Sequence, residues 1–261
     1  MNIFRQVIRI KNRIYVQFIA PVIEKSFVYN GETIHYLHYK KKSDFLLVCF
    51  SAYNDNGPRY DYVTSLSKYP LNRLYIKDDF VEKTGNYYLG RNGNYSIEDA
   101  VFHLIEKIKE EDCPKKLIFI GSSKGGYAAL NFGIRFKNAS VIVAAPQYKL
   151  GDYMYNTAKK FRPALEDIVG MPVTEEKIRN LNQRLSGKIN DDKEILTQSF
   201  YIHCSSNDRT YEKHVKYLLE DLAVKEAKVH FDLAAYEGHD TLKYHFPKYL
   251  CECIEKELAT K

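Results

Sequence analysis

A glycine-rich pentapeptide between an apolar run and a helix-forming run is the feature that most restricts the fold of this chain. Residues 121–125 read GSSKG, after the apolar KKLIFI and before GYAALNFGIRF, which is typical of a helix. A chain that leaves a buried strand and enters a helix through so short a turn must reverse sharply. Only small residues two places before and after the central serine leave room for that reversal. Gly121 and Gly125 meet this requirement, so the pattern predicts that Ser123 lies at the tip of a strand-to-helix turn.

Strand and helix patterns alternate along most of the sequence. Apolar runs typical of buried strands occupy residues 44–53, 72–79, 115–120, 139–146, 198–206 and 227–236. Helical patterns lie between or after them, at 96–111, 121–136, 211–223 and 242–258. This alternation predicts an α/β fold with a mostly parallel central sheet and helices on both of its faces.

Two segments depart from the alternation. Near the N-terminus, RIYVQFIA at 13–20 and TIHYLHY at 33–39 flank a turn-like stretch, which predicts an antiparallel strand pair at one edge of the sheet. Residues 151–195 are charged and loosely helical, and they predict an inserted helical cap. The total length suits one domain that spans 1–261.

Composition and charge restrict the class of protein. The chain is 45% hydrophobic and carries a net charge of +6, but it has no long cationic tract of the kind that a dedicated nucleic-acid binder needs. No apolar run is long enough to span a bilayer, and the first residues lack the apolar core of a secretion signal, so we expect a cytoplasmic protein. The five cysteines fall mainly in apolar or helical segments, which predicts reduced, buried thiols and no metal site.

The serine of the turn needs chemical partners if it is a nucleophile. A serine hydroxyl requires a base within hydrogen-bond reach, and the base requires an acid that fixes its tautomer. After a nucleophile of this type the chain order is acid and then histidine, each on a loop that follows a strand. Asp208 is the only carboxylate in the loop after the strand predicted at 198–206, and His239 follows the last predicted strand. The sequence therefore predicts Ser123, His239 and Asp208 as nucleophile, base and acid.

Two alternatives stay open at this point. Asp240 adjoins His239 and is a rival for the acid, although a carboxylate in that place is more typical of a helix cap. The glycine-rich turn could instead bind a phosphate group, for which Lys124 would also suit. A Walker-type loop, however, needs a lysine followed directly by serine or threonine, and the sequence lacks that pair.

The same turn predicts part of an oxyanion hole. One backbone N–H comes from the residue after the nucleophile, Lys124. The second comes from the loop after the apolar run LLVCF, where Ala52 is the first choice and Ser51 and Tyr53 are the alternatives. The ammonium group of Lys124 then either attracts an anionic substrate or is an ordinary solvated surface group.

Several of these motifs resemble a known family. The segments FIGSSKGGYAAL, AAPQYKLGDYM, EGHD and CFSAY are similar to those of bacterial capsular polysaccharide O-acetyltransferases with an α/β-hydrolase fold. The resemblance runs from about residue 47 to the C-terminus and does not cover the N-terminal forty residues or the cap. Related chains are also associated with capsule biosynthesis or accessory secretion.

The resemblance implies a mechanism and substrates. It implies the same triad, with Lys124 and Ala52 as backbone donors, an acetyl-serine intermediate, acetyl-CoA as co-substrate and no tightly bound cofactor. It also implies a capsule-type polysaccharide as acceptor and allows peripheral association with a capsule assembly. An acetyl esterase would use the same triad, and a catalytically silent scaffold is the third reading.

Some residues are candidates for contacts with the substrate or with CoA. Ser51 and Tyr53 lie in the oxyanion loop, while Gln147 and Lys149 follow a strand and either line the site or form a structural turn. A transferase would also use a basic rim for the CoA phosphates, and the candidates for it are Lys124, Lys149, Lys159, Lys160 and Arg162. Lysines on a helical cap are otherwise ordinary solvated residues.

Overall fold

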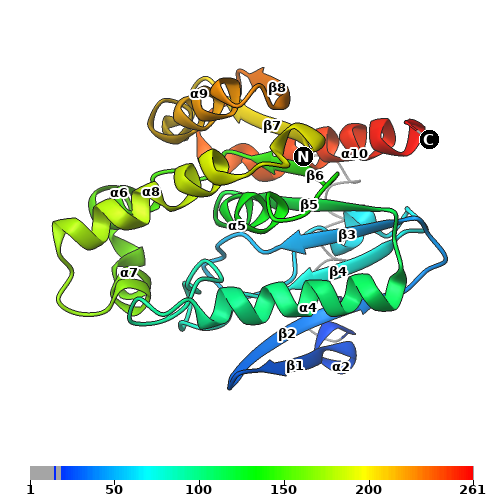
Figure 1. The fold of residues 1–261 in the computed structure, drawn as a ribbon, viewed down its shortest axis with the longest axis horizontal. Helices are drawn as coiled ribbons and strands as arrows, with labels where there is room; N and C mark the ends of the chain where they lie inside the picture. The colour runs from blue at the N-terminus through cyan, green and yellow to red at the C-terminus, as the bar shows by residue number, and fades with distance from the viewer. Residues whose placement is uncertain (1–14, 16–18, 261) are drawn as a thin grey trace.

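The computed structural model describes residue 15 and residues 19–260, and an eight-stranded sheet forms their centre (Figure 1). The strands are β1 (Lys25–Tyr29), β2 (Glu32–Tyr39), β3 (Phe45–Phe50), β4 (Asn72–Ile76), β5 (Lys116–Ser122), β6 (Ser140–Ala144), β7 (Ser199–Ser205) and β8 (Lys228–Ala234). They follow the order β1-β2-β4-β3-β5-β6-β7-β8 across the sheet.

Helices connect these strands. The α-helices are α2 (Ala20–Ile23), α3 (Val63–Leu66), α4 (Ser96–Asp112), α5 (Lys124–Gly133), α6 (Leu150–Asp152), α7 (Arg162–Val169), α8 (Glu175–Asp191), α9 (Lys216–Val224) and α10 (Leu242–Ala259). Shorter helical turns are η2 (Tyr153–Thr157), η3 (Lys159–Phe161), η4 (Ile195–Thr197), η5 (Tyr211–Val215) and η6 (His239–Thr241).

The sheet is mostly parallel, as the alternation predicts. Strand β3 pairs in parallel with β4 and β5, and the pairs β5–β6, β6–β7 and β7–β8 are parallel as well. Every residue of β3, β4, β6 and β7 is buried, which is typical of parallel strands covered on both faces. The carboxyl ends of the parallel strands therefore share one edge, and the loops that follow them meet there.

The N-terminal strand pair differs from its prediction. The antiparallel partner of β2 is β1 at 25–29, directly before the turn, and β2 also pairs antiparallel with β4. Most of the strand predicted at 13–20 lies outside the described residues, and its last residue, Ala20, begins helix α2. The proline that follows Ala20 favours the first turn of a helix, because its fixed φ suits that position.

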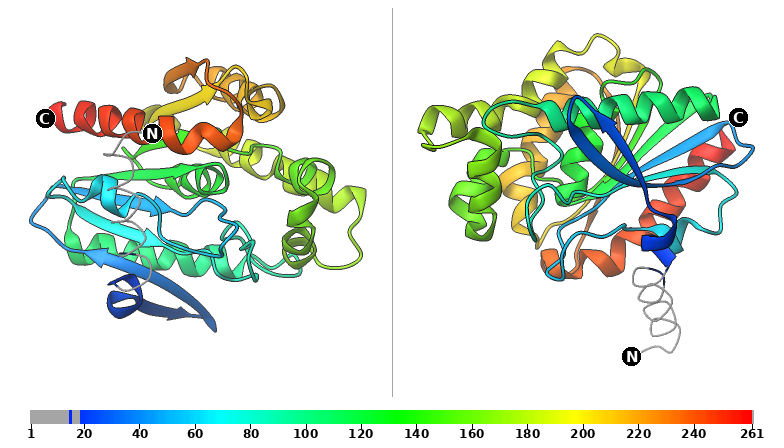
Figure 2. Two further views of the ribbon diagram at one scale, coloured as in Figure 1. Left: turned by 180° about the vertical axis from the view of Figure 1, so that it is seen from behind. Right: turned by 90° about the horizontal axis from the view of Figure 1, so that it is seen from below.

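Helices cover both faces of the sheet. Helix α4 lies on one face and α10 on the other (Figure 2). The apolar positions of α4 that the sequence marks, Val101, Leu104, Ile105 and Ile108, are all buried against the sheet. In the part of the chain that the structure describes, no helix is long and apolar enough to cross a membrane.

The segment predicted as a helical cap is largely helical. Helices α6 and α7 lie beyond the end of the sheet to which the β3 arrow points, which is the carboxyl edge (Figure 1). Helix α8 packs mainly against α6 and also contacts α5 and α9, so it connects this segment to the helical layer over the sheet.

One cysteine departs from the expected burial. Cys49, Cys204 and Cys253 are buried free thiols and Cys251 is half-buried, but Cys113 is exposed. Cys113 follows helix α4 as its C-cap, with a φ of 47° in the left-handed region that commonly ends helices.

Candidate active site

The strand-to-helix turn predicted around Ser123 is present between β5 and α5. Ser123 has φ 51° and ψ −118°, a conformation that residues with a side chain rarely adopt. A Cβ atom on Gly121 would overlap the carbonyl group of Gly125, and one on Gly125 would lie 2.5 Å from the Phe50 oxygen. Both glycines are therefore required by close backbone contacts. The Ser123 N–H donates to the Ala144 oxygen at 2.8 Å, which ties the turn to the end of β6.

The three residues predicted as a triad lie in one hydrogen-bonded row. His239 Nε2 is 2.9 Å from Ser123 Oγ, and His239 Nδ1 is 2.7 Å from Asp208 Oδ2. Asp208 follows β7 and His239 opens η6 after β8. A carboxylate only accepts hydrogen bonds, so Nδ1 donates to Asp208, and Nε2 is left to accept the Ser123 O–H. This arrangement orients an imidazole to remove a proton from the serine hydroxyl.

Asp208 is held as a carboxylate by its surroundings. It is 3% exposed, and burial disfavours its charged form, but the hydrogen bonds from His239 and from the Thr210 N–H outweigh burial and hold the pKa of Asp208 below its ordinary value. The Thr210 N–H donates to Asp208 Oδ1 at 2.8 Å. Sequence reasoning did not single out Thr210, although an aspartate side chain commonly accepts the backbone N–H of the residue two places further on. Asp240 is exposed, and the histidine bonds Asp208 instead.

The predicted oxyanion hole is only partly open. Lys124 is the first residue of α5, so its N–H has no acceptor within the helix. The Ala52 N–H, predicted as the second donor, donates to Asp61 Oδ2 at 2.9 Å. The Ser51 N–H, one alternative, donates to the Tyr88 hydroxyl at 2.9 Å. An acyl oxyanion could use the Ala52 N–H only after the Asp61 carboxylate had moved away from it.

The side chain of Lys124 takes neither of the two roles expected for it. It is 3% exposed, and its Nζ lies 2.7 Å from Asp78 Oδ2 and donates to the Thr84 oxygen at 3.3 Å. The ammonium group therefore neither attracts an anionic substrate nor lies in solvent. Asp78 also accepts the N–H groups of Asn86 and Tyr87, at 2.9 and 2.8 Å. This ion pair fixes the loop after β4 against the turn that carries Ser123.

Breaking the buried Lys124–Asp78 ion pair should lower the stability of the fold by a large amount. Replacing Asp78 with asparagine would leave the Lys124 ammonium buried without a charge partner, and breaking a buried pair in this way costs about 3–5 kcal/mol. We expect the free energy of unfolding of Asp78→Asn in urea to fall by about that amount. Asp44→Asn is the matched control, because Asp44 pairs with Lys115 at the surface, and such pairs contribute about 0–1 kcal/mol. Equal losses in the two variants would contradict this account.

Two of the predicted substrate contacts are buried. Ser51 is 2% exposed, and its hydroxyl donates to the Arg59 oxygen, so it has no surface with which to touch a substrate. Gln147 is fully buried, and its Nε2 lies 2.9 Å from Ser123 Oγ. Gln147 therefore contacts the candidate nucleophile rather than a surface that a substrate could reach.

Tyr53 connects the oxyanion loop to the cap. Its ring is half-buried and packs edge-on against Phe161 of η3, with 5.0 Å between ring centroids. The Nζ of Lys160 lies 3.8 Å above the Tyr53 ring and 3.8 Å from the carboxylate of Asp55. The cap thus carries an exposed cation next to the loop predicted to stabilise the oxyanion.

The other basic residues predicted for the rim have separate surroundings. Lys149 Nζ lies 3.1 Å above the ring of Tyr217, and the guanidinium group of Arg162 lies 4.0 Å above the ring of Tyr155. Lys159 is exposed. Cations over aromatic rings contribute about 0.5–1 kcal/mol at exposed sites. The contacts of Lys149 and Arg162 with tyrosine rings therefore account for the positions of these two side chains, and no ligand is needed to explain them.

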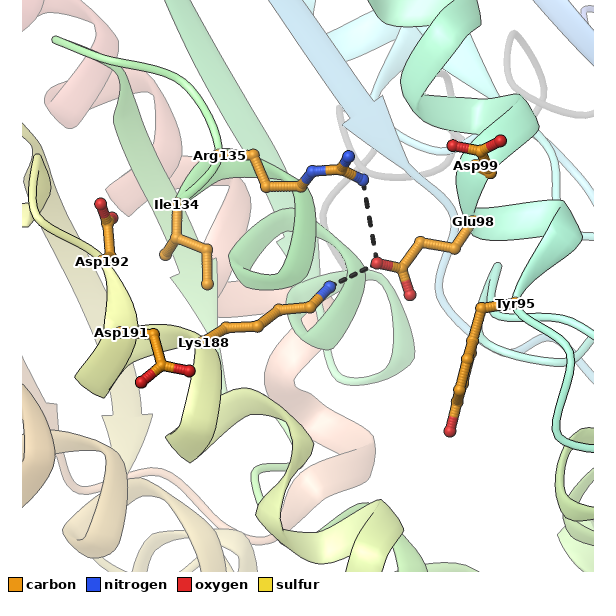
Figure 3. Close-up of a pocket in the computed structure, with 8 residues that line it drawn as sticks. All are labelled: Tyr95, Glu98, Asp99, Ile134, Arg135, Lys188, Asp191 and Asp192. Atoms are coloured by element: carbon orange, nitrogen blue, oxygen red, sulfur yellow. Dashed lines mark hydrogen bonds and ion pairs between the residues drawn. The ribbon is translucent and has the colours of Figure 1, made fainter.

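A cavity of about 560 Å³ opens away from the triad, between α4, α5 and α8 (Figure 3). The buried Glu98 carboxylate lies at its base and pairs with Arg135, Arg184 and Lys188. Burial lowers the pKa of Lys188 to about 8, although Glu98 opposes this shift. The lining residues are Tyr95, Glu98, Asp99, Ile134, Arg135, Lys188, Asp191 and Asp192. The four acidic residues of the lining, Glu98, Asp99, Asp191 and Asp192, outnumber Arg135, Arg184 and Lys188, so the charge of the cavity does not favour an anion.

Comparisons with known proteins extend this picture. No model of a known protein family matches the sequence, and no curated protein matches it. Among solved structures, the capsule O-acetyltransferase of Neisseria meningitidis serogroup A superposes with a TM-score of 0.72 at 20% identity, covering 91% of this chain and 100% of that one. The serine hydrolase FphF of Staphylococcus aureus gives a TM-score of 0.62 at 13% identity, covering 91% and 96%. The chain has the α/β-hydrolase fold.

This α/β-hydrolase fold is shared with proteins of different functions. The Glycosylation Associate Protein (Gap123) complex from Streptococcus agalactiae gives a TM-score of 0.75 at 15% identity, over 91% of this chain and 46% of that one. A histidine-to-alanine mutant of the meningococcal enzyme was solved in complex with CoA. At these identities the likeness shows the fold alone, and the prediction of an α/β-hydrolase fold with a mostly parallel sheet is confirmed.

Proposed function

We propose that this protein is a serine-dependent acyltransferase that moves an acetyl group from acetyl-CoA to a hydroxyl of a capsule-type polysaccharide. The observation that carries the proposal is the row Ser123–His239–Asp208, with separations of 2.9 and 2.7 Å. Such a row activates a hydroxyl for nucleophilic attack, and it is poised for attack on an acyl group.

The first half of the reaction acylates the serine. Ser123 Oγ attacks the thioester carbonyl carbon while its proton passes to His239 Nε2. Negative charge develops on the carbonyl oxygen, where the Lys124 N–H and, once Asp61 has moved, the Ala52 N–H are proposed to bind it. The carbon–sulfur bond then breaks, and the His239 proton goes to the departing thiolate. The products are CoA and acetyl-Ser123.

The second half of the reaction transfers the acetyl group to the sugar and regenerates the free Ser123 hydroxyl. A sugar hydroxyl gives its proton to His239 Nε2 and attacks the acetyl carbon of acetyl-Ser123. Collapse of the tetrahedral intermediate breaks the bond to Ser123 Oγ, which takes back the proton from His239. The Asp208 carboxylate stabilises the imidazolium that forms in each half-reaction, and its lowered pKa keeps it charged near neutral pH.

The choice of acetyl-CoA and a glycan rests on similarity. The motif resemblance to capsule O-acetyltransferases and the shared fold with the meningococcal enzyme both favour it, and a mutant of that enzyme binds CoA. The cap and the exposed Lys160 beside Tyr53 are compatible with a covered site that has a cationic edge. A complete triad argues against a catalytically silent scaffold.

The proposal is tested by mass spectrometry and CoA release. We expect protein incubated with acetyl-CoA to gain one acetyl group on Ser123, with slow release of CoA in water alone. A suitable capsule-type polysaccharide should speed CoA release and become O-acetylated. Ser123→Ala should gain no acetyl group.

An acetyl esterase is the second candidate, because serine hydrolases such as FphF share the fold. If the protein ignores acetyl-CoA but cleaves simple acetyl esters or acetylated glycans rapidly, the esterase reading replaces the transferase. The cap would then act as a lid that selects the substrate.

A further inference from the structure

We propose that Gln147 is a catalytic residue whose side-chain amide donates a hydrogen bond to the attacking oxygen of Ser123. The separation between Gln147 Nε2 and Ser123 Oγ is 2.9 Å. This inference rests on the proposed role of Ser123 as nucleophile, and it assigns Gln147 to the reacting atom itself rather than to the oxyanion hole or to the substrate.

The hydrogen-bond pattern around Ser123 requires a donor at this position. Asp208 accepts from His239 Nδ1, so His239 Nε2 accepts the single proton of the serine hydroxyl. Oγ then has only lone pairs to offer to Gln147, and the amide nitrogen is the group that can donate to them. The direction of each hydrogen bond in the row is thereby fixed, and the serine O–H is aimed at the base.

Packing does not explain a glutamine at this site. Gln147 is fully buried, and among the described residues its Oε1 has no hydrogen-bond partner. A buried acceptor without a partner is unfavourable, and a methionine would fill a similar volume without it. The contact of Gln147 with Ser123 is the gain that offsets this cost.

A second buried glutamine shows the contrast. Gln198 is 1% exposed, and its Oε1 also lacks a partner among the described residues. Its Nε2, however, donates to the backbone oxygens of Ile134 and Phe136 at 2.8 and 3.2 Å, so it satisfies the end of helix α5. Gln198 has a structural function, whereas the Gln147 amide bonds the candidate nucleophile.

The backbone holds the Gln147 side chain in place. Ala145 has a φ of 41°, which is unfavourable for a residue with a side chain, and its N–H donates to the His203 oxygen at 2.8 Å. Pro146 packs against Gly126, where an added Cβ would lie 3.1 Å from the proline ring. A strained turn fixed on both sides therefore presents Gln147 to Ser123.

The amide can assist both half-reactions. As the proton leaves Oγ for His239, negative charge develops on Oγ, and the Gln147 N–H stabilises it. When the acyl group later leaves, Oγ again becomes negative before the proton returns, and the same hydrogen bond acts a second time. The amide proton stays on Gln147 throughout, so no further reactant is needed.

The test compares Gln147→Met with Gln198→Met by the rate at which 4-nitrophenyl acetate acylates Ser123 in the first turnover. We expect Gln147→Met to acylate about 10- to 100-fold more slowly, because it removes one hydrogen bond to an oxygen that becomes charged. Its midpoint of urea unfolding should be unchanged or higher, since the unpartnered Oε1 is gone. Gln198→Met should show the reverse: a lower midpoint and an unchanged rate per folded molecule.

Gln147→Glu separates catalysis from structure through pH. A protonated carboxyl group at this position donates to Oγ as the amide does, whereas an ionised one repels the developing charge. We therefore expect the acylation rate of Gln147→Glu, relative to the original protein, to fall as the pH rises. An unchanged rate in Gln147→Met, or a loss in Gln147→Glu that is the same at every pH, would overturn the assignment. If Ser123 itself is not acylated in the original protein, the proposed function fails instead.

Discussion

Replacing Ser123 with alanine should lower turnover by about 10⁴- to 10⁶-fold, because the members of a triad act as one unit and no other hydroxyl takes the place of Oγ. The fold should be intact, since alanine keeps the Cβ atom and the Ser123 N–H bond to Ala144 involves only backbone. The measurement is the rate of CoA release from acetyl-CoA with glycan, or of 4-nitrophenyl acetate cleavage, beside the urea unfolding curve.

Ser122 provides the matched control for this prediction. It adjoins Ser123 in the chain, but its hydroxyl bonds to the hydroxyl of Tyr62 at 2.6 Å and is not part of the triad row. Ser122→Ala should therefore keep turnover within a few fold of the original. A folded Ser123→Ala protein that remains active, or equal losses in both variants, would remove the assignment of Ser123 as nucleophile.

The sequence predicts most of the sheet and the row of three residues because both depend on local signals. Buried parallel strands appear as apolar runs, and the residues that follow such strands must meet at one edge of the sheet. The register of β7 and β8 pairs Ser205 with Ala234, so the loops that carry Asp208 and His239 begin side by side. Chain order and strand ends are enough to predict that both residues lie close to Ser123.

The contacts around this row depend on long-range packing instead. Lys124 at the start of α5 and Asp78 in the loop after β4 are 46 residues apart, and β3 lies between β4 and β5 in the sheet. No local pattern shows that a lysine beside a nucleophile is buried, so both roles expected for its side chain were wrong. The sequence predicts that Gln147 lies at the edge of the sheet, but its burial and its contact with Ser123 follow only from the strained turn after β6.

The loop after β3 that carries Ala52 also has a contact that the sequence does not predict, although the two residues involved are close in the chain. The position of Ala52 after β3 follows from the sequence, and the acceptor of its N–H does not. Asp61 lies nine residues further on, and the chain must fold back to bring this carboxylate to the Ala52 N–H. The Asp61 carboxylate thus occupies one of the two N–H groups predicted to bind a reaction oxyanion, and in the proposed reaction it would compete with that oxyanion for the Ala52 N–H.

Replacing Asp208 with asparagine should lower turnover by about 10³- to 10⁴-fold. The carboxylate accepts from His239 Nδ1 at 2.7 Å, which leaves Nε2 without a proton and able to accept one from Ser123. An asparagine amide can donate to Nδ1, and His239 then carries its proton on Nε2, where it cannot act as a base. The imidazolium formed during the reaction would also lose the neighbouring negative charge.

Asp240→Asn separates this effect from a general loss of negative charge beside the histidine. Asp240 adjoins His239 in the chain but is exposed, and Nδ1 of the histidine bonds Asp208 instead, so turnover should stay within about threefold of the original.

The pKa of Asp208 lies below its ordinary value in the folded protein, so its ionised form stabilises the fold at neutral pH and this contribution is lost as the pH falls. Asp208→Asn should therefore show a smaller decrease of stability with acid than Asp240→Asn, in urea unfolding measured from neutral to acidic pH. Equal or reversed losses of turnover in the two variants would transfer the role of acid to Asp240, and an unchanged acid dependence would show that the Asp208 carboxylate is not coupled to His239 in solution.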